Sequence, residues 1–557
     1  MARKRTQVKE AASLNKSVAS IFQGTSELSD IDPEPEKVEK IEQIQPVKNA
    51  FDDGEDFSNS PYALRIIYGV QDYLNDNMTL LIFVQLCVFV YIMDIIYLKL
   101  DSFPKLKETW QVIGFNALGV SSGLVLNFVK NKDRGLPEFN QFYSMIFPTL
   151  YSVIHFDQNY FLANLCLNYF IADNLHPLFS MFCSAMFYGV YHEVENLELF
   201  GFVQMIFIHT ILLYTFKYIG DKKSFSKTES QLLTIGIVNI FFNNQLINRY
   251  LPLQIFQKLL ISLMVASFLT FPLYDYIPQL VSGLVFAGAF YYLTVYQLYF
   301  VLKENAVVWL YNYIFNDEEN VQILSIWFGM LAIVIPIVFL NVDRLGVNFR
   351  RKIWHFLIIA ILLFNRDILT TKIEFTLICL LGAIILFMIT EMIRATQLTF
   401  AGRLLYQLLG KFQDAKDLHG PLNLSYIYLV LGVTLPIVYD YMINDKATIV
   451  RYMGVLSLGI GDSMASIIGR KFGNVKWKGS NKSLQGTIAF ILSTFAAFYL
   501  VDYYMNSHPG YTPISNWENV FVVTIITGLL EGASDLNDNF LIPIVMPITL
   551  EVLNRCF

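Results

Sequence analysis

Residues that could bind a polyphosphate gather in one stretch of the chain. Asp462 follows two glycines, Gly459 and Gly461, and glycine lets a ligand or another backbone approach closely. Five cations then alternate with small and hydroxyl residues over Arg470–Thr487. Backbone N–H groups and cationic side chains neutralise phosphates, and a carboxylate can hold the Mg²⁺ that bridges them. This mixture predicts a nucleotide phosphate site with Asp462 as metal ligand or base.

The same stretch has a second interpretation. Gly469 and Gly473 are four residues apart, which is also the spacing of closely packed membrane helices. A basic loop after a membrane helix is common on the cytosolic side. Packing does not require Asp462, however, and anchoring does not require small residues among lysines, so we favour the phosphate site. It is not a Walker A loop, because GxxxxGK[ST] is absent.

Three acids form a second group. Glu531, Asp535 and Asp538 fall at i, i+4 and i+7, so they would share one face if a single helix ran through them. Carboxylates this close repel one another unless a cation or a proton intervenes. We therefore expect bound Mg²⁺ or nearby lysines. The alternative is a polar loop with ordinary helix-capping acids.

Two smaller charged groups precede these. Arg351 and His355 are four apart and share a helical face at the start of an apolar run. The alternative there is a positive anchor whose side chains reach the membrane surface. Glu391 and Arg394 are three apart, and we expect an intrahelical ion pair.

Membrane helices must position these groups. The 557 residues are 55% hydrophobic and 15% charged, whereas about 25% charged residues is usual for soluble domains. Apolar runs that could span a bilayer recur from residue 80 onward, so we predict an all-α fold, a polytopic transmembrane helical bundle of about 15 helices. The predicted spans lie near 80–99, 110–129, 139–155, 175–191, 196–218, 231–247, 254–274, 279–301, 321–341, 353–364, 374–393, 425–442, 449–468, 487–505, 518–532 and 540–553.

The chain divides into three predicted parts. Residues 1–60 are charged, contain Ser and Pro, and lack the apolar core of a signal peptide, so we expect a disordered cytosolic tail. Residues 61–345 form an N-terminal transmembrane scaffold, whose lone histidines are expected to be packed rather than metal-binding. Residues 346–557 form a C-terminal catalytic transmembrane domain.

The side of the membrane follows from the basic loops, because short cytosolic loops carry an excess of Lys and Arg. These loops are Lys130–Arg134, Lys222–Lys227, Arg344–Lys352, Arg403–Lys416 and Arg470–Lys482. Cytosolic nucleotides could then reach the last three. The formal net charge of −6 argues against nucleic acid as a partner.

The charged groups together resemble the dolichol kinase family. The family's nucleotide motif GD-xx-A-xxx-G-xxx-G is matched by Gly461, Asp462, Ala465, Gly469 and Gly473. Its continuation KKTxEG stands here as Asn481-Lys482-Ser483-Leu484-Gln485-Gly486, so a cation and a carboxylate are replaced. A second motif is matched by Glu531, Asp538, Asn539, Leu541 and Pro543, and leaves Asp535 outside it. An arginine-lysine-xx-histidine element is matched by Arg351, Lys352 and His355.

The resemblance implies transfer of the γ-phosphoryl group of CTP to the hydroxyl of dolichol, giving dolichyl phosphate and CDP for protein glycosylation. It implies Mg²⁺ or another divalent cation, dolichol in the bilayer, and an endoplasmic reticulum enzyme whose CTP-binding loop and active site face the cytosol. A homo-oligomer is compatible with the sequence. Asp462, Glu531 and Asp538 would bind the metal, with Arg351 and His355 beside them in catalysis. The nucleotide contacts would be Lys352, Gly461, Ala465, Ser466, Gly469, Gly473, Lys476, Lys478, Gly479, Lys482, Ser483 and Gly486.

Three alternatives remain open from the sequence. A CTP-dependent diacylglycerol or phytol kinase has overlapping motifs, and a cytidylyltransferase also uses a GD-xx-A-xxx-G run. A transporter is the alternative from a different class, because many helices with intramembrane acids also suit an ion pathway. Charge concentrated in one third of the chain counts against the transporter.

Overall fold

The described part of the protein is a bundle of helices. The computed structural model describes residues 79–99, 143, 199–221, 224–274, 276–413, 417, 420–478 and 480–557. Within these ranges the only β pairings are two isolated bridges, so the predicted all-α class is confirmed. Nine helices of the described ranges are long and apolar enough to cross a membrane. The protein is therefore a multi-pass membrane protein.

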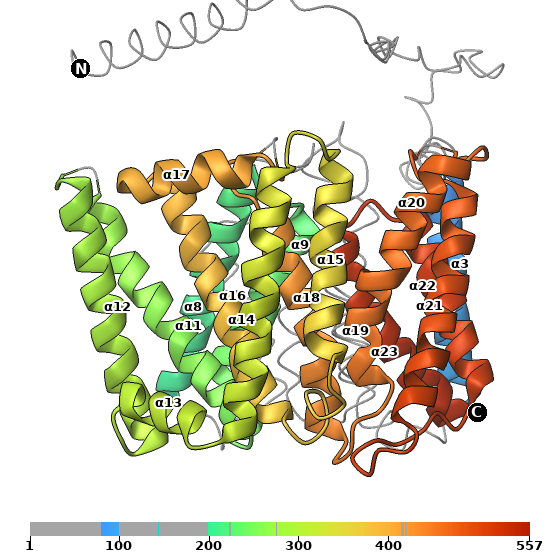
Figure 1. Ribbon diagram of the computed structural model, residues 1–557, viewed down its shortest axis with the longest axis horizontal. Helices are drawn as coiled ribbons and strands as arrows, with labels where there is room; N and C mark the ends of the chain where they lie inside the picture. The colour runs from blue at the N-terminus through green and yellow to red at the C-terminus, as the bar shows by residue number, and fades with distance from the viewer. Residues whose placement is uncertain are drawn as a thin grey trace, which may run out of the picture. The chain divides into compact units, whose positions relative to one another are not determined.

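The described helices follow the predicted spans closely. Their bounds are α3 (Leu80–Leu98), α8 (Leu199–Asp221), α9 (Lys227–Phe242), α10 (Asn244–Ile247), α11 (Leu251–Thr270), η4 (Phe271–Leu273), α12 (Gln279–Leu302), α13 (Ala306–Phe315), α14 (Glu318–Leu340), α15 (Val347–Leu363), α16 (Ile373–Thr396), α17 (Thr399–Gly410), α18 (Ser425–Ile443), α19 (Val450–Leu456), η6 (Ser457–Gly461), α20 (Asp462–Phe472), α21 (Leu484–Met505), α22 (Trp517–Ala533) and α23 (Asp538–Cys556) (Figure 1). The predicted tail, spans 110–129 and 175–191, and all of span 139–155 except Tyr143 lie outside the described residues.

Two helices correct the predictions. α17 occupies the first part of the basic stretch predicted as a loop over Arg403–Lys416, so that prediction is wrong for residues 403–410. α17 lies across the end of α16 in Figure 1, and its Phe400 is 74% exposed. It has 12 residues and α13 has 10, too few to span a bilayer. A search for span-length apolar runs passes over such short helices.

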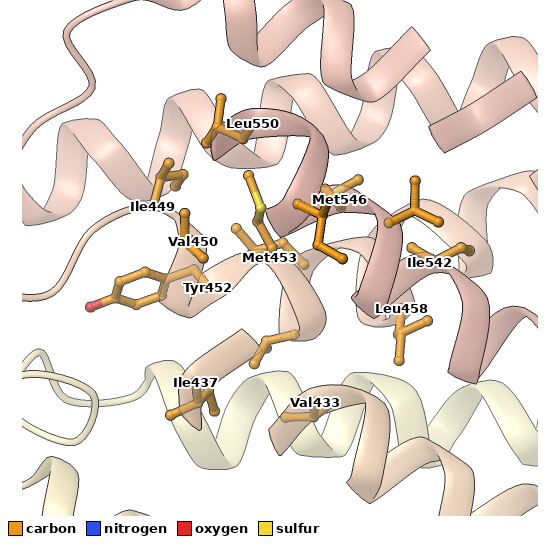
Figure 2. Close-up of a cluster of buried hydrophobic side chains, with 14 of the residues drawn as sticks. Val433, Ile437, Ile449, Val450, Tyr452, Met453, Leu458, Ile542, Met546 and Leu550 are labelled. Atoms are coloured by element: carbon orange, nitrogen blue, oxygen red, sulfur yellow. The ribbon is translucent and has the colours of Figure 1, made fainter. Parts of the chain in front are cut away.

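The core of the C-terminal third joins α18, α19 and α23. Figure 2 shows Val433 and Ile437 of α18 on one side of Met453, with Met546 of α23 on the other. All four side chains have no exposed surface. Within a membrane such packing supplies van der Waals contact, because lipid is as apolar as the side chains themselves. This core holds the helices that flank the polar groups described below.

A buried ion pair also ties α18 to α19. The Arg451 Nε donates to Asp440 Oδ2 at 2.7 Å, and both side chains are at most 2% exposed. The Arg451 Nη1 donates to the carbonyl oxygen of Leu369 at 2.9 Å. Thr448 and Asn444 donate to the Asp440 carboxylate. Both charges are therefore satisfied by hydrogen bonds, as buried ions must be.

Replacing Asp440 with alanine is expected to destabilise the protein by about 3 kcal/mol, because it leaves the buried Arg451 guanidinium unpaired. The measurement is the melting temperature of the detergent-solubilised protein. Asp343→Ala is the control, since Asp343 pairs with Lys411 at 3.7 Å on the surface and such pairs contribute little. Equal melting temperatures for the two variants would contradict the role given to the buried pair.

Candidate active site

A π-helical turn places the first acid of the site. Residues Ser457–Gly461 form this turn between α19 and α20, and the Asp462 N–H donates to the carbonyl of Ser457. A π-turn inserts an extra residue into a helix and is frequent at functional sites. Gly459 in this turn lies against α15, because a Cβ added there would be 2.4 Å from Ile359. The close approach brings α15 within reach of Asp462.

Two side chains of α15 meet the Asp462 carboxylate. The Lys352 Nζ lies 2.5 Å from Asp462 Oδ2, and the His355 Nδ1 lies 3.5 Å from the same oxygen. His355 Nδ1 is 2.8 Å from the Leu458 carbonyl, which can only accept, so Nδ1 carries the proton. The Asp462 and Lys352 side chains are 15% and 13% exposed. They are therefore sheltered but within reach of a ligand.

Lys482 contacts the other two acids of the site, Glu531 and Asp538. Its Nζ lies 2.8 Å from Asp538 Oδ1 and 3.2 Å from Glu531 Oε1, and donates to the Glu531 carbonyl at 2.5 Å. Burial opposes the charge of this ammonium, but Asp538 and Glu531 outweigh that effect and raise the pKa of Lys482 above its usual value. The ammonium therefore stays charged at neutral pH. The expected lysine beside the acids is confirmed.

The three acids do not share one helical face, because no single helix runs through them, and the alternative of a polar loop between two helices describes this segment. α22 ends at Ala533, Ser534 is extended with ψ 147°, and α23 begins at Asp538 after its cap Asn537. A turn between two helices, rather than one continuous helix, brings Glu531 and Asp538 to the same lysine. Asp535 is exposed on that turn.

The two acid–lysine groups belong to one site. Ser483, the residue after Lys482, donates to the Gly469 carbonyl of α20 at 3.4 Å, so the loop that carries Lys482 packs against the helix that begins at Asp462. Elements far apart in the sequence therefore contribute to a single polar region: α15, the start of α20, the loop after α20, and the α22–α23 turn. Among the described residues, no three side chains of His, Cys, Asp or Glu come close enough to hold a metal ion by themselves.

This donor set suits Mg²⁺ that arrives with a nucleotide. Mg²⁺ is usually held by one or two carboxylates together with phosphate oxygens and water, and seldom by an all-protein cage. Asp462, Asp538 and Glu531 supply separate carboxylates, each beside a lysine that can also meet phosphate. The residues therefore fit a metal–nucleotide complex.

The loop after α20 turns back on itself to bring in Lys482. The Leu484 N–H donates to the Val475 carbonyl at 2.8 Å, and the Trp477 N–H donates to the Lys482 carbonyl at 3.0 Å. The Trp477 indole donates to Thr487 at 3.0 Å. These bonds hold the ends of the loop together, while Lys476 and Lys478 on it are exposed.

Several of the residues predicted to contact the nucleotide also pack closely against neighbouring helices. A Cβ added to Gly473 would lie 1.9 Å from the Gly469 carbonyl oxygen, and one added to Gly469 would lie 2.9 Å from Ser483 Oγ. Ser483 caps α21 by accepting from the Gly486 N–H at 3.1 Å. These residues join α20 to α21, as the alternative interpretation of the motif anticipated. Gly461 also lies against α21, where an added Cβ would meet Thr494 Oγ1 at 2.2 Å.

The other predicted residues that the structure describes lie on α20, on α15 or in the loop after α20. Ala465 is buried and Ser466 half-buried on α20, and Gly479 lies outside the described residues. Arg351 is half-buried on α15, with its charge acting on His355, but Lys352 is the residue that meets Asp462. Gln485, which replaces the family's glutamate, accepts from the Val475 N–H at 3.2 Å. An amide can therefore support this loop.

The Glu391–Arg394 ion pair is confirmed and is part of a larger buried network. Arg394 donates twice to Glu391, at 2.8 and 2.6 Å, and once to the Pro421 carbonyl at 2.7 Å. Glu391 also accepts from the Asn423 N–H and the Tyr426 hydroxyl, each at 2.6 Å. The network fastens the segment that leads into α18. Sequence spacing predicted the pair but could not reveal these partners.

Sequence reasoning missed two polar residues of the N-terminal half. Gln85 of α3 donates to the Ala533 carbonyl at 2.9 Å, and Glu229 of α9 accepts from the Asn537 N–H at 3.3 Å. Both are buried and both contact the turn between Glu531 and Asp538. The one available signal was a lone polar residue in an apolar span, as at Gln85.

Comparison with known proteins supports the resemblance. Residues 33–245 match the dolichol kinase N-terminal domain. A dolichol kinase of Saccharomyces cerevisiae is 30% identical over 431 residues, which cover 74% of this chain and 77% of the yeast protein. The chain belongs to the dolichol kinase family. Another dolichol kinase, from Schizosaccharomyces pombe, is 31% identical over 44% of this chain and 50% of its own length.

More distant similarity reaches beyond dolichol kinases. A chloroplastic farnesol kinase of Arabidopsis thaliana is 32% identical over 22% of this chain and 39% of its own length. No solved structure matches the chain significantly. The N-terminal domain match covers α3, Tyr143 and Glu229, so the missed residues fall in a segment typical of dolichol kinases.

Replacing Gly473 with alanine is expected to open the loop and to destabilise the protein by about 2 kcal/mol, because the new methyl group overlaps the Gly469 carbonyl. Limited trypsin digestion at Lys476 and Lys478, together with the melting temperature, measures this effect. Gly236→Ala is the control, since nothing lies within 4 Å of a Cβ there. Wild-type cleavage rates in Gly473→Ala would refute the packing role.

Proposed function

We propose that this protein transfers the γ-phosphoryl group of CTP to the terminal hydroxyl of dolichol, forming dolichyl phosphate and CDP. The observation that carries the proposal is the convergence of Asp462, Glu531 and Asp538 with Lys352 and Lys482 in one site. Membership of the dolichol kinase family supports the same reaction. Similarity to a farnesol kinase supports phosphorylation of a prenyl alcohol as the reaction class.

The proposed chemistry is mainly positioning and charge neutralisation around a loose transition state. The dolichol hydroxyl oxygen forms a bond to the γ-phosphorus, and the bond between that phosphorus and the oxygen bridging to CDP breaks. The hydroxyl proton passes to a carboxylate, Glu531 or Asp538, which lie together on the α22–α23 turn. Lys352 and Lys482 turn from their carboxylates toward the phosphates, whose negative charge attracts them.

Asp462 is proposed as the main metal ligand, with Asp538 and Glu531 beside it. A bound Mg²⁺ would offset phosphate charge and favour departure of CDP. His355 holds its Nδ1 proton toward Leu458, which leaves its imidazole oriented beside Asp462. Lys476 and Lys478, exposed on the loop, are proposed to meet the outer phosphates or the cytidine.

The proposed active site faces the cytosol. Two of the five basic stretches supply lysines to its acids, since Lys352 donates to Asp462 and Lys482 donates to Asp538. A third basic stretch is joined to the first of these, because Arg350 donates to the Lys411 carbonyl. Clusters of Lys and Arg at one end of a membrane bundle favour the cytosolic side. CTP would then arrive from the cytosol, and dolichol laterally from the membrane of the endoplasmic reticulum.

Membranes that contain this protein are expected to transfer label from γ-labelled CTP to dolichol. Asp462→Asn should reduce this rate roughly 100-fold, because an amide neither pairs with Lys352 nor binds a divalent cation well. Asp535→Asn, a change at an exposed acid of the α22–α23 turn, serves as the matched control and should retain activity.

Parallel reactions with ATP and with diacylglycerol test the donor and the acceptor. If diacylglycerol became labelled and dolichol did not, the protein would be a diacylglycerol kinase rather than a dolichol kinase. A further reaction with α-labelled CTP and a phosphorylated lipid tests for a cytidylyltransferase, which would form a labelled CDP-lipid and release pyrophosphate. Absence of transfer to any lipid by folded protein supplied with Mg²⁺ would refute the kinase proposal and favour a transporter.

Treatment with EDTA is expected to abolish transfer while leaving the melting temperature unchanged. The reason is that the acids are held by lysines and helix ends rather than by a metal cage. Mg²⁺ added back should restore the activity fully. A large fall in the melting temperature with EDTA would instead indicate a structural metal.

A further inference from the structure

The turn between α22 and α23 decides where two proposed catalytic acids lie. We call residues 534–537 the acid turn. Glu531 lies two residues before the end of α22, and Asp538 is the first residue of α23. Within the turn, the Leu536 N–H donates to Ser534 Oγ at 3.2 Å. A shift at either end of the acid turn would therefore move one acid relative to Lys482.

Gln85 holds the first end. Its Nε2 donates to the Ala533 carbonyl at 2.9 Å, and its Oε1 accepts from the Tyr143 hydroxyl. Gln85 is 3% exposed and Tyr143 has no exposed surface. The last carbonyls of a helix lack intrahelical donors, and a buried one without a partner is costly. α3, which packs beside α22 in Figure 1, supplies that partner.

Glu229 holds the second end. Its Oε1 accepts from the Asn537 N–H at 3.3 Å, and its Oε2 accepts from the Ser226 N–H at 2.7 Å. Asn537 is the cap of α23, since its side chain accepts from the Asn539 N–H at 3.0 Å. A carboxylate near a helix N-terminus is also favoured by the helix dipole. One buried glutamate thus caps α9 and fixes the residue before Asp538.

We infer that Gln85 and Glu229 are positioning residues, which fix the two ends of the acid turn and so set the geometry of Glu531 and Asp538 about Lys482. This inference rests on the proposed function. Both residues, with Tyr143, lie within the segment that matches the N-terminal domain of dolichol kinases. That domain therefore helps to arrange acids that are carried by the opposite part of the chain.

The test uses the full-length, detergent-solubilised protein and two matched pairs of variants. Glu229→Ala removes both the bond to the Asn537 N–H and the bond from the Ser226 N–H that caps α9. Its control, Ser226→Ala, removes the other capping bond, from the Glu229 N–H to Ser226 Oγ, and keeps the bond between Glu229 and Asn537. Gln85→Leu removes the bond to Ala533. Its control, Gln257→Leu, removes a glutamine of α11 that is also buried and that donates to the carbonyl of Ile240 in α9 at 2.8 Å.

The first readout is hydrogen exchange of the peptide spanning the acid turn, in the absence of metal and nucleotide. Glu229→Ala and Gln85→Leu should exchange about tenfold faster there than wild type, because local opening becomes easier. The second readout is kinetic. The Mg²⁺ concentration for half-maximal transfer should rise about tenfold, as it does when partners of metal ligands are removed, while the KM for dolichol stays unchanged.

Ser226→Ala and Gln257→Leu should leave the exchange of the acid turn and the Mg²⁺ dependence near wild type, even where the melting temperature falls. Wild-type exchange in Glu229→Ala and Gln85→Leu, or an equal effect in the control variants, would overturn the inference. If wild-type protein makes no dolichyl phosphate, the proposed function fails instead, and the exchange experiment still reports whether the two residues hold the turn.

Discussion

Two carboxylates that lie side by side in a partly buried site cannot both remain charged without a cation between them. In this protein that cation is Lys482, which contacts Asp538 and Glu531 together. The need to place Lys482 between these acids constrains several other elements of the fold. The loop after α20 must return to the α22–α23 turn, and it does so because Gly469, Gly473 and Gly486 let α20 approach α21 closely. A change in any of these elements moves the lysine away from its acids.

The apolar pattern and the motif spacing predicted most of the helices and the main charged residues. Span-length apolar runs located every described helix long enough to cross a bilayer, and the motifs selected Asp462, Glu531 and Asp538. Spacing alone failed at the α22–α23 turn, where acids at i, i+4 and i+7 fit a continuous helix. In the structure α22 ends before Ser534, which is extended, and Asn537 caps α23. The spacing of hydrophobic residues does not indicate this break.

Other parts of the site depend on tertiary contacts that a sequence does not display. Gln85 and Ala533 are 448 positions apart, so nothing near Gln85 identifies its partner. The spacing of Arg351 and His355 suggested a shared face, but the two side chains of α15 that meet Asp462 are Lys352 and His355. The motif glycines were assigned to nucleotide contact, and their observed neighbours are helices. In each case the residue type was informative and its partner was not.

The π-turn at Ser457–Gly461 has a consequence for how the polar and apolar surfaces of one span are related. Each residue of an α-helix turns the chain by about 100°, so the extra residue in this turn shifts the phase between the two halves of the span. The α19 half can therefore face the core through Met453, while the α20 half turns Asp462 toward Lys352. A single uninterrupted α-helix would have to sacrifice one of these two orientations. The span thus consists of two helical segments whose faces are rotated relative to each other. Deleting one residue of the turn would rotate every side chain of one segment away from its present partners.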